Sequence, residues 1–143
     1  MRALKIVERV HERIANRRMD FINQVSRGLV DRFSVVAFED LNIKNILQNG
    51  NLAKSTSDVA WGMLVAATGS KAAYSGSEVI LVNPRNTSQV CSGCETIVQK
   101  ELADRVHSCP RCGIVMDRDL SAALNILRLG VQSLRQIYGS PGL

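Results

Sequence analysis

The sequence has no long hydrophobic run. Its longest purely apolar run, residues 63–67, is far shorter than the roughly 20 apolar residues that a helix needs to cross a bilayer. The opening residues, Met-Arg-Ala-Leu-Lys, also lack the apolar segment of a secretory signal peptide. We therefore expect no membrane partner and a cytoplasmic location, in which the cysteines would stay reduced.

Low-complexity tracts and internal repeats are also absent, apart from a pair of cysteine motifs. The 143 residues, of which 45% are hydrophobic, suit one ordinary domain that buries about two-thirds of its unfolded surface. The formal net charge of +5 is compatible with an anionic partner such as nucleic acid but does not require one.

All four cysteines lie in two C-x-x-C pairs, Cys91 with Cys94 and Cys109 with Cys112, separated by fourteen residues. Four thiolates at this spacing can surround one metal ion tetrahedrally, although the separation is one residue shorter than usual. An all-sulfur site favours zinc or iron, and nothing in the sequence indicates electron transfer. We therefore predict structural zinc; the alternative of two disulfides would need an oxidising compartment.

Two glycines and one histidine belong to the same stretch. We expect Gly93 and Gly113 to adopt positive φ, because the backbone of a metal-binding turn has to point its amides toward the sulfurs. His107 is the one other nearby side chain that could ligate the metal. We predict that the four cysteines suffice without it.

Two acids, Asp117 and Asp119, follow the second cysteine pair. Residues 120–129 are rich in Ala and Leu, so they predict a helix with Asp119 as its N-cap. In that role the carboxylate would only accept hydrogen bonds from the first amides of the helix. The alternative role, as a ligand for a metal, is not decided by this segment alone.

Residues 1–30 predict one long helix with a basic outer face. Seven Lys or Arg stand against three acids in this segment. Apolar residues recur at helical spacing, and arginines occupy the opposite face. The apolar set is Val7, Val10, Ile14, Phe21, Val25 and Leu29, and the arginines are Arg9, Arg13, Arg17 and Arg27. Such a basic face is either solvated or lies along a phosphate backbone.

Two short apolar segments, residues 33–38 and 78–82, predict strands that are buried on both faces. Between them the sequence predicts a polar loop over residues 42–57 and a helix from Ser57 and Asp58 toward Tyr74, with Trp61 in the core. The order strand, helix, strand predicts an α/β fold with a parallel pair.

The first of these strands is followed by acids. Glu39 and Asp40 come at its carboxyl end, where open α/β sheets place their ligands. An acid at the end of a strand is also common without any function. Glu39 is thus a candidate ligand whose role needs further support.

Three stretches together resemble one protein family. C-x-x-C and C-x-x-C-G, followed by D-R-D-x-x-A-A-x-N-I, resemble the C-terminal end of the TnpB family. These are transposon-encoded, RNA-guided nucleases related to the type V CRISPR effectors. Phe-Glu39-Asp40-Leu-Asn resembles the family's second RuvC motif, and residues 11–21 resemble the helix that leads into it. One mild departure is Ser121, where the family often has Asn.

The resemblance implies a partial RNase H-like (RuvC-type) α/β fold with an inserted four-cysteine zinc ribbon. Residues 1–84 would form part of the nuclease core, 85–116 the ribbon, and 117–143 a C-terminal helix that completes the core. Glu39 and Asp119 would be catalytic ligands of magnesium or manganese, and Asp117 an accessory group. DNA and guide-type RNA would be the partners, bound by Arg9, Arg13, Arg17, Arg105, Arg111 and Arg118.

The family's first RuvC motif, a strand that carries an aspartate, has no counterpart in these residues. We therefore expect no nuclease activity from the chain alone, and a partner that is either an upstream fragment of the same nuclease or a second copy. The alternative function is a non-catalytic zinc-ribbon module that binds nucleic acid. A ribbon protein of transcription or translation would account for the cysteines but not for Glu39 or the D-R-D segment.

Overall fold

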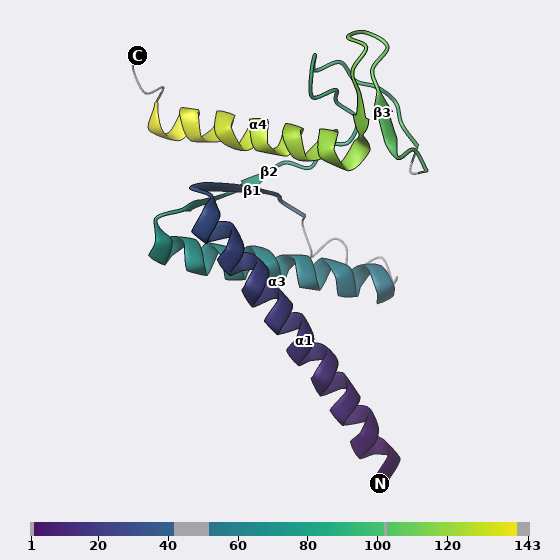
Figure 1. Cartoon of the computed structure of the whole chain (residues 1–143), viewed down its shortest axis with the longest axis vertical. Coiled ribbons are helices and arrows are strands. Elements are labelled where there is room, and N and C mark those ends of the chain that lie inside the picture. The colour runs from purple at the N-terminus through teal and green to yellow at the C-terminus, as the bar shows by residue number, and fades with distance from the viewer. Residues whose placement is uncertain (1, 42–51, 102, 140–143) are drawn as a thin grey trace. The chain divides into compact units, whose positions relative to one another are not determined.

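The computed structural model describes residues 2–41, 52–101 and 103–139. The helices and strands of these residues follow one another as α1 (Arg2–Arg32), β1 (Val35–Glu39), α3 (Leu52–Ser75), β2 (Glu78–Val82), β3 (Val106–Ser108), β4 (Val115–Asp117) and α4 (Arg118–Tyr138) (Figure 1). The chain divides into two compact units. The first comprises Met1–Val36 and Leu41–Val79, and the second comprises Ala37–Asp40 and Ile80–Leu143.

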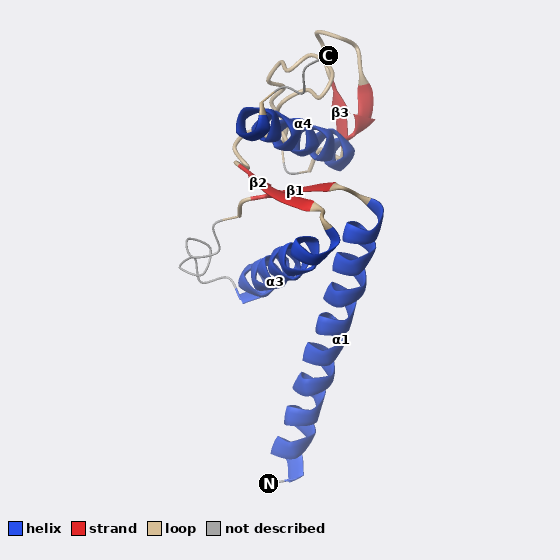
Figure 2. Cartoon of the chain, turned by 90° about the vertical axis from the view of Figure 1, so that its left-hand side faces the viewer, coloured by secondary structure: helices blue, strands red, loops and turns tan. Residues whose placement is uncertain are grey.

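The long N-terminal helix is confirmed, but its packed face differs from the predicted one. α3 packs against α1, and the side chains of α1 that become buried are Ile22, Ser26 and Val30. These follow one another at steps of four residues and so share one face. The predicted apolar face was wrong: Phe21 is 63% exposed and, in the N-terminal part of the helix, Val7 and Ile14 remain 52% and 49% exposed. This part of α1 projects past α3 (Figure 2), so α3 does not cover it.

The helix predicted to start at Ser57 and Asp58 begins at Leu52 instead. Leu, Ala and Lys at positions 52–54 are good helix formers, which explains why the helix extends upstream of that pair. The predicted loop is therefore wrong for residues 52–57, while residues 42–51 lie outside the described part. Trp61 is half-buried and lines a cavity of about 300 Å³ formed by α1, α3 and Leu41, so it is not a core residue.

β1 and β2 form a two-stranded sheet (Figure 2). The amide of Glu78 donates to the carbonyl of Ser34, and the amide of Asp40 donates to the carbonyl of Val82, both at 2.8 Å. Both strands therefore run in the same direction, as the strand–helix–strand order predicted. β2 has the predicted bounds, whereas β1 begins two residues after Phe33.

The prediction that these strands are buried on both faces was wrong. Burial alternates along β1, where Val36 and Phe38 are buried, and Leu81 of β2 is 49% exposed. Strands of parallel sheets are buried on both faces when further strands and helices flank them. The described residues supply no third strand to this sheet.

The second unit joins a small hairpin directly to the last helix. β3 and β4 pair antiparallel, with Val106 opposite Asp117. β4 ends at Asp117 and α4 begins at Arg118, with no connecting residue. Farther along α4, a Cβ added to Gly130 would lie 2.8 Å from the Cβ of Ala37 in β1. Only glycine permits this approach between helix and strand.

None of the described helices has the combination of length and apolar character that a membrane crossing requires.

Candidate metal centre and carboxylate pocket

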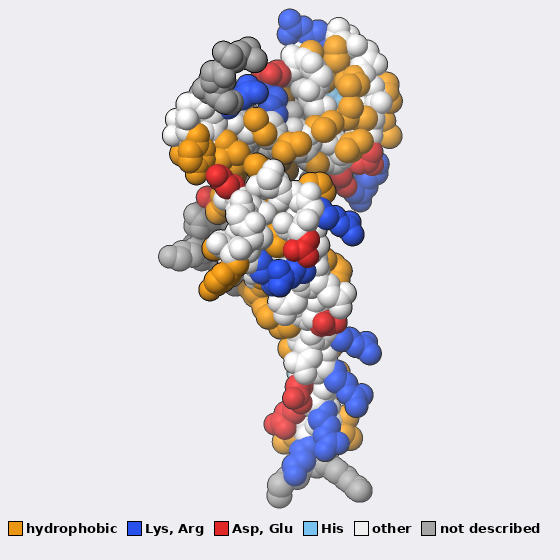
Figure 3. All heavy atoms as spheres, turned by 60° about the vertical axis from the view of Figure 1, so that its left-hand side comes forward, with side chains coloured by type: hydrophobic (Ala, Val, Ile, Leu, Met, Phe, Trp, Pro, Cys, Tyr) orange, Lys and Arg blue, Asp and Glu red, His pale blue; other side chains and the backbone are white. Residues whose placement is uncertain are grey.

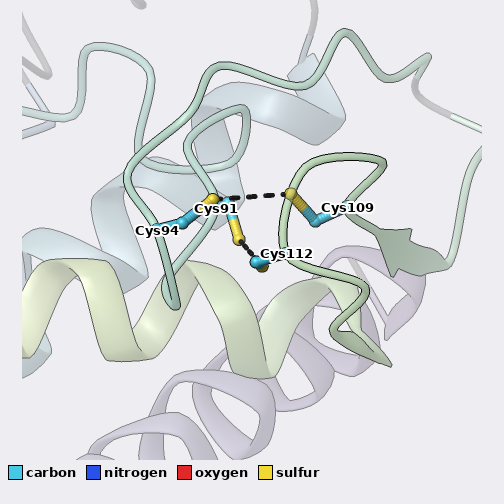
Figure 4. Close-up of side chains that lie close together, drawn as sticks. All are labelled: Cys91, Cys94, Cys109 and Cys112. Atoms are coloured by element: carbon cyan, nitrogen blue, oxygen red, sulfur yellow. Dashed lines mark hydrogen bonds between the residues drawn. The ribbon is translucent and has the colours of Figure 1, made fainter.

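The four cysteine side chains converge on one point (Figure 4). The sulfurs of Cys91 and Cys112 lie 3.6 Å apart, as do those of Cys94 and Cys109. All four sulfurs lie within 4.8 Å of one another, and none is in a disulfide. Zinc–sulfur bonds of about 2.3 Å give a tetrahedron with edges of about 3.8 Å. The thiols therefore have close to the spacing that one zinc ion requires.

The two cysteine pairs form the same turn. The amide of Glu95 donates to the carbonyl of Cys91, and the amide of Gly113 donates to the carbonyl of Cys109, each at 2.9 Å. In both turns the residue after the second cysteine has positive φ, 60° at Glu95 and 74° at Gly113. The prediction of positive φ is confirmed for Gly113. It was wrong for Gly93, because the left-handed position follows the second cysteine of each pair.

Neighbouring groups change the proton affinities of the thiols. Hydrogen bonding with the side chain and the backbone of Thr96 lowers the pKa of Cys94 to about 6. The backbone amide of Cys112 lowers the pKa of Cys109. The amide of Ile114 acts in the same direction on Cys112, but burial and the adjacent thiols raise the pKa of Cys112 to about 12. Full ionisation of the cluster therefore needs a cation to balance the charge.

His107 is fully buried on β3, and neither ring nitrogen has a hydrogen-bond partner among the described groups. The cluster of four close ligand atoms consists of the cysteines and does not include His107. Burial, and then the charge of Lys100, lower the pKa of His107. The ring therefore behaves as a neutral core side chain beside the cluster.

The two carboxylates named as catalytic candidates line the same cavity. Glu39 at the end of β1 and Asp119 in the first turn of α4 both border a space of about 560 Å³ within the second unit. The remaining lining mixes six polar or charged residues with four apolar ones: Thr87, Ser88, Gln89, Lys100, Glu101 and Arg118, and Pro84, Ala122, Ala123 and Ile126. This cavity, which we call the carboxylate pocket, has the oxygen ligands that magnesium and manganese prefer.

A hydrogen bond from Thr87 holds the carboxylate of Glu39. The Thr87 hydroxyl donates to Oε1 of Glu39 at 2.5 Å. The side-chain amide of Asn125 donates to the carbonyls of Thr87 at 3.0 Å and Val90 at 2.8 Å. Neither Thr87 nor Asn125 was among the predicted site residues. Asn125 does belong to the D-R-D-x-x-A-A-x-N motif, and this was the available signal.

The prediction that Asp119 caps the last helix was wrong, because Asp117 is the cap. Oδ1 of Asp117 accepts hydrogen bonds from the amides of Asp119 at 2.8 Å and Leu120 at 3.0 Å. β4 runs directly into α4, and this places Asp117 at the boundary. Asp119 instead lies in the first helical turn, 76% exposed and 3.5 Å from Nε of Arg118. A carboxylate is favourable there because it faces the positive end of the helix dipole.

Two cations also line the carboxylate pocket. The ammonium of Lys100 donates to the carbonyl of Ser88 at 2.5 Å, and burial lowers the pKa of Lys100. Arg118 donates to the carbonyl of Glu101 at 3.3 Å. Arg118 was a predicted nucleic-acid contact, whereas Lys100 was not. A single lysine in a polar loop belongs to no recognisable motif, so the sequence offered no signal for it.

The other predicted nucleic-acid contacts lie outside the carboxylate pocket. Arg9, Arg13 and Arg17 are exposed on α1, along whose N-terminal half basic and apolar side chains appear side by side (Figure 3). Arg105 and Arg111 are exposed in the ribbon, where Arg111 donates to the hydroxyl of Thr96 at 3.0 Å.

Comparison with known proteins gives matches over most of the chain. A family model described as "Cas12f1-like, TNB domain" matches residues 61–126. A putative RNA-guided DNA endonuclease of Streptomyces pristinaespiralis is 40% identical over 132 residues, which cover 91% of this chain and 33% of the relative. TnpB-like protein MJ1635 of Methanocaldococcus jannaschii is 29% identical and matches 100% of this chain and 34% of its own length. The chain thus spans about one third of the length of these relatives.

A solved structure shares the fold. One chain in a cryo-EM structure of a Cas12f1–sgRNA–target DNA complex matches with a TM-score of 0.62 and 21% identity. The match covers 81% of this chain and 35% of that chain. The α/β arrangement described above is therefore one that a Cas12f1 chain also contains.

Proposed function

This chain belongs to the TnpB family, which is related to the type V CRISPR effectors, and corresponds to the C-terminal part of its members. We propose that it functions as the C-terminal part of a TnpB-like nuclease. In this proposal it binds DNA and guide-type RNA and supplies two carboxylates to a two-metal phosphodiesterase site. The observation that carries the proposal is the carboxylate pocket, which Glu39 and Asp119 share.

The proposal assigns a partial RuvC-type core to residues 1–84 and 117–143, with residues 85–116 as the zinc ribbon. Cys91, Cys94, Cys109 and Cys112 would hold zinc as a structural ion, which their sulfur spacing supports. The ribbon lies between β2 and α4 in the sequence. Zinc would therefore fix where the chain enters α4 and, with it, the position of Asp119.

Glu39 and Asp119 would hold magnesium or manganese, with Asp117 left to its role as helix cap. Such ions activate a water nucleophile and neutralise the charge on the leaving oxygen. The cations Lys100 and Arg118 line the same pocket, so they would bind a phosphate of the nucleic acid. The resemblance implies three core acids, of which this chain matches two, so the third would come from another segment or chain.

The test is a nuclease assay with purified chain, magnesium or manganese, and single- and double-stranded DNA, run beside Glu39→Ala and Asp119→Ala. We expect no cleavage by the chain alone. We expect cleavage when a fragment with the first RuvC strand and its aspartate is added, and loss of that cleavage in either variant. Cleavage that persists in both variants would come from a contaminant.

Failure of the added fragment to produce cleavage would favour the second candidate, a zinc-ribbon module that binds nucleic acid without chemistry. The exposed Arg105 and Arg111 of the ribbon support this candidate, because neither lines the carboxylate pocket. DNA binding that depends on these arginines but not on Glu39 or Asp119 would then be the expected result.

A further inference from the structure

The segment between β2 and the first cysteine, residues 83–90, is held by buried polar side chains. Thr87 is 4% exposed and Asn125 is 1% exposed. The amide of Asn125 donates to the carbonyls of Thr87 and Val90 at 3.0 and 2.8 Å. A buried amide that binds two backbone carbonyls satisfies both and fixes the backbone between them.

The same segment holds the carboxylate of Glu39. The hydroxyl of Thr87 lies 2.5 Å from Oε1 of Glu39 and 3.1 Å from the carbonyl of Pro84. A hydroxyl has one hydrogen, and the shorter contact, to a carboxylate, is the stronger of the two. Contacts therefore run without a break from Asn125 on α4, through Thr87, to Glu39 at the end of β1.

We propose that Thr87 and Asn125 are positioning residues for Glu39: Thr87 fixes one carboxylate oxygen, and Asn125 fixes the backbone that carries Thr87. This inference rests on the proposed function, because it requires Glu39 to bind a divalent cation. Hydrogen-bond partners of a metal ligand orient it, and their loss typically costs about 10- to 100-fold in metal affinity.

The test measures the affinity of the zinc-loaded chain for manganese by electron paramagnetic resonance. We expect Thr87→Val, which removes the hydroxyl at nearly constant volume, to weaken manganese binding about 10-fold or more. Thr87→Ser keeps the hydroxyl and should retain most of the affinity. Thr68→Val is the matched control, since Thr68 is also fully buried and donates to the carbonyl of Leu64 at 2.7 Å. It should bind manganese like the wild type.

The variant Glu39→Gln separates this inference from the proposed function. If Glu39→Gln binds manganese as the wild type does, Glu39 is not a ligand, and both the proposed function and this inference are overturned. If Glu39→Gln loses affinity while Thr87→Val keeps it, only the positioning role is overturned. Thr87→Val keeps the methyl group and Thr87→Ser keeps the hydroxyl, so equal losses in the two variants would mean that loss of the hydroxyl is not the cause and would also overturn it.

A second measurement does not depend on how well the Thr87 variants fold. In nuclear magnetic resonance spectra, manganese should broaden the methyl signal of Thr87 and the side-chain amide signal of Asn125 in the wild type. Glu39→Gln should shift both signals and leave the methyl signal of Thr68 in place. If neither the Thr87 nor the Asn125 signal moves in folded Glu39→Gln, the inference is overturned.

Discussion

Asp117 and Asp119 are separated by one residue and have different structural roles. Asp117 accepts hydrogen bonds from two amides of α4, so its carboxylate is committed to the start of the helix. Asp119 lies in the first turn, lines the carboxylate pocket and remains 76% exposed. The two acids should therefore respond differently to substitution, one through stability and the other through metal binding.

We predict that Asp117→Ala lowers the free energy of unfolding by about 1 kcal/mol, as loss of an N-cap usually does, and leaves manganese affinity close to that of the wild type. Asp117→Asn, which can still cap, should be nearly as stable as the wild type. Asp119→Asn should show the reverse, with weakened manganese binding and only the small loss of stability that follows from removing a carboxylate from the first helical turn. Denaturant unfolding and manganese titration together check this. A stability loss confined to Asp119→Asn would contradict the assignment of the cap.

At the scale of single elements, the distance between α4 and β1 depends on Gly130. A methyl group at this position would lie 2.8 Å from the Cβ of Ala37, closer than packed carbon atoms can approach. Gly69 in α3 provides a matched position, because a Cβ there would have no neighbour within 4 Å. Both glycines lie inside helices, so the same substitution has the same effect on helix propensity.

We predict opposite effects of alanine at the two glycines. Gly69→Ala should stabilise the protein by about 0.5 to 1 kcal/mol, since alanine is the better helix former. Gly130→Ala should destabilise it by about 1 to 3 kcal/mol, as overpacking does. Thermal or denaturant unfolding of both variants measures this difference. Stabilisation by Gly130→Ala would mean that α4 lies farther from β1 than described.

Among the described residues of the ribbon, Cys91 and Cys109 are the buried apolar side chains, so we expect its fold to depend on zinc. Structural zinc in small modules contributes an apparent 10 to 16 kcal/mol, roughly, at neutral pH. Chelation should unfold residues 85–116 while the helical circular dichroism of α1 and α3 persists. Cys91→Ser should lose zinc, and Ser108→Ala, at the exposed neighbour of Cys109, should keep it. Clearly less than one zinc per chain, with freely reacting thiols, would contradict the metal centre.

For the whole molecule, we predict nucleic-acid binding that is mainly electrostatic and nearly independent of base sequence. Affinity should fall steeply between about 50 and 200 mM salt, because each neutralised phosphate releases counterions. Replacing Arg9, Arg13 and Arg17 together by glutamine, or Arg105 and Arg111 together, should weaken binding and reduce the salt dependence. Arg135→Gln, at an exposed arginine of α4 outside these sets, is the control. Binding that does not respond to salt would leave these arginines as a solvated surface.

The sequence was sufficient for features that depend on local pattern or spacing. The length of α1, the bounds of β2 and the convergence of the four thiols follow from periodicity, β-branched composition and C-x-x-C spacing. The face of α1 that becomes buried depends on where α3 packs. The cap of α4 depends on where β4 ends, and the burial of β1 depends on its neighbours. Thr87 and Asn125 are joined by one buried hydrogen bond across 38 positions, which no periodicity in the sequence predicts.

The missing linker between β4 and α4 has a mechanical consequence. The amide of Arg118, the first residue of α4, donates to the carbonyl of Arg105 at 2.9 Å, and the residue before it is both the end of β4 and the cap of the helix. Because no residue lies between β4 and α4 and hydrogen bonds hold both sides of this junction, the junction has no hinge. The hairpin therefore acts as a rigid lever on α4, so a force that tilts its tip would rotate the first helical turn and carry Asp119 with it.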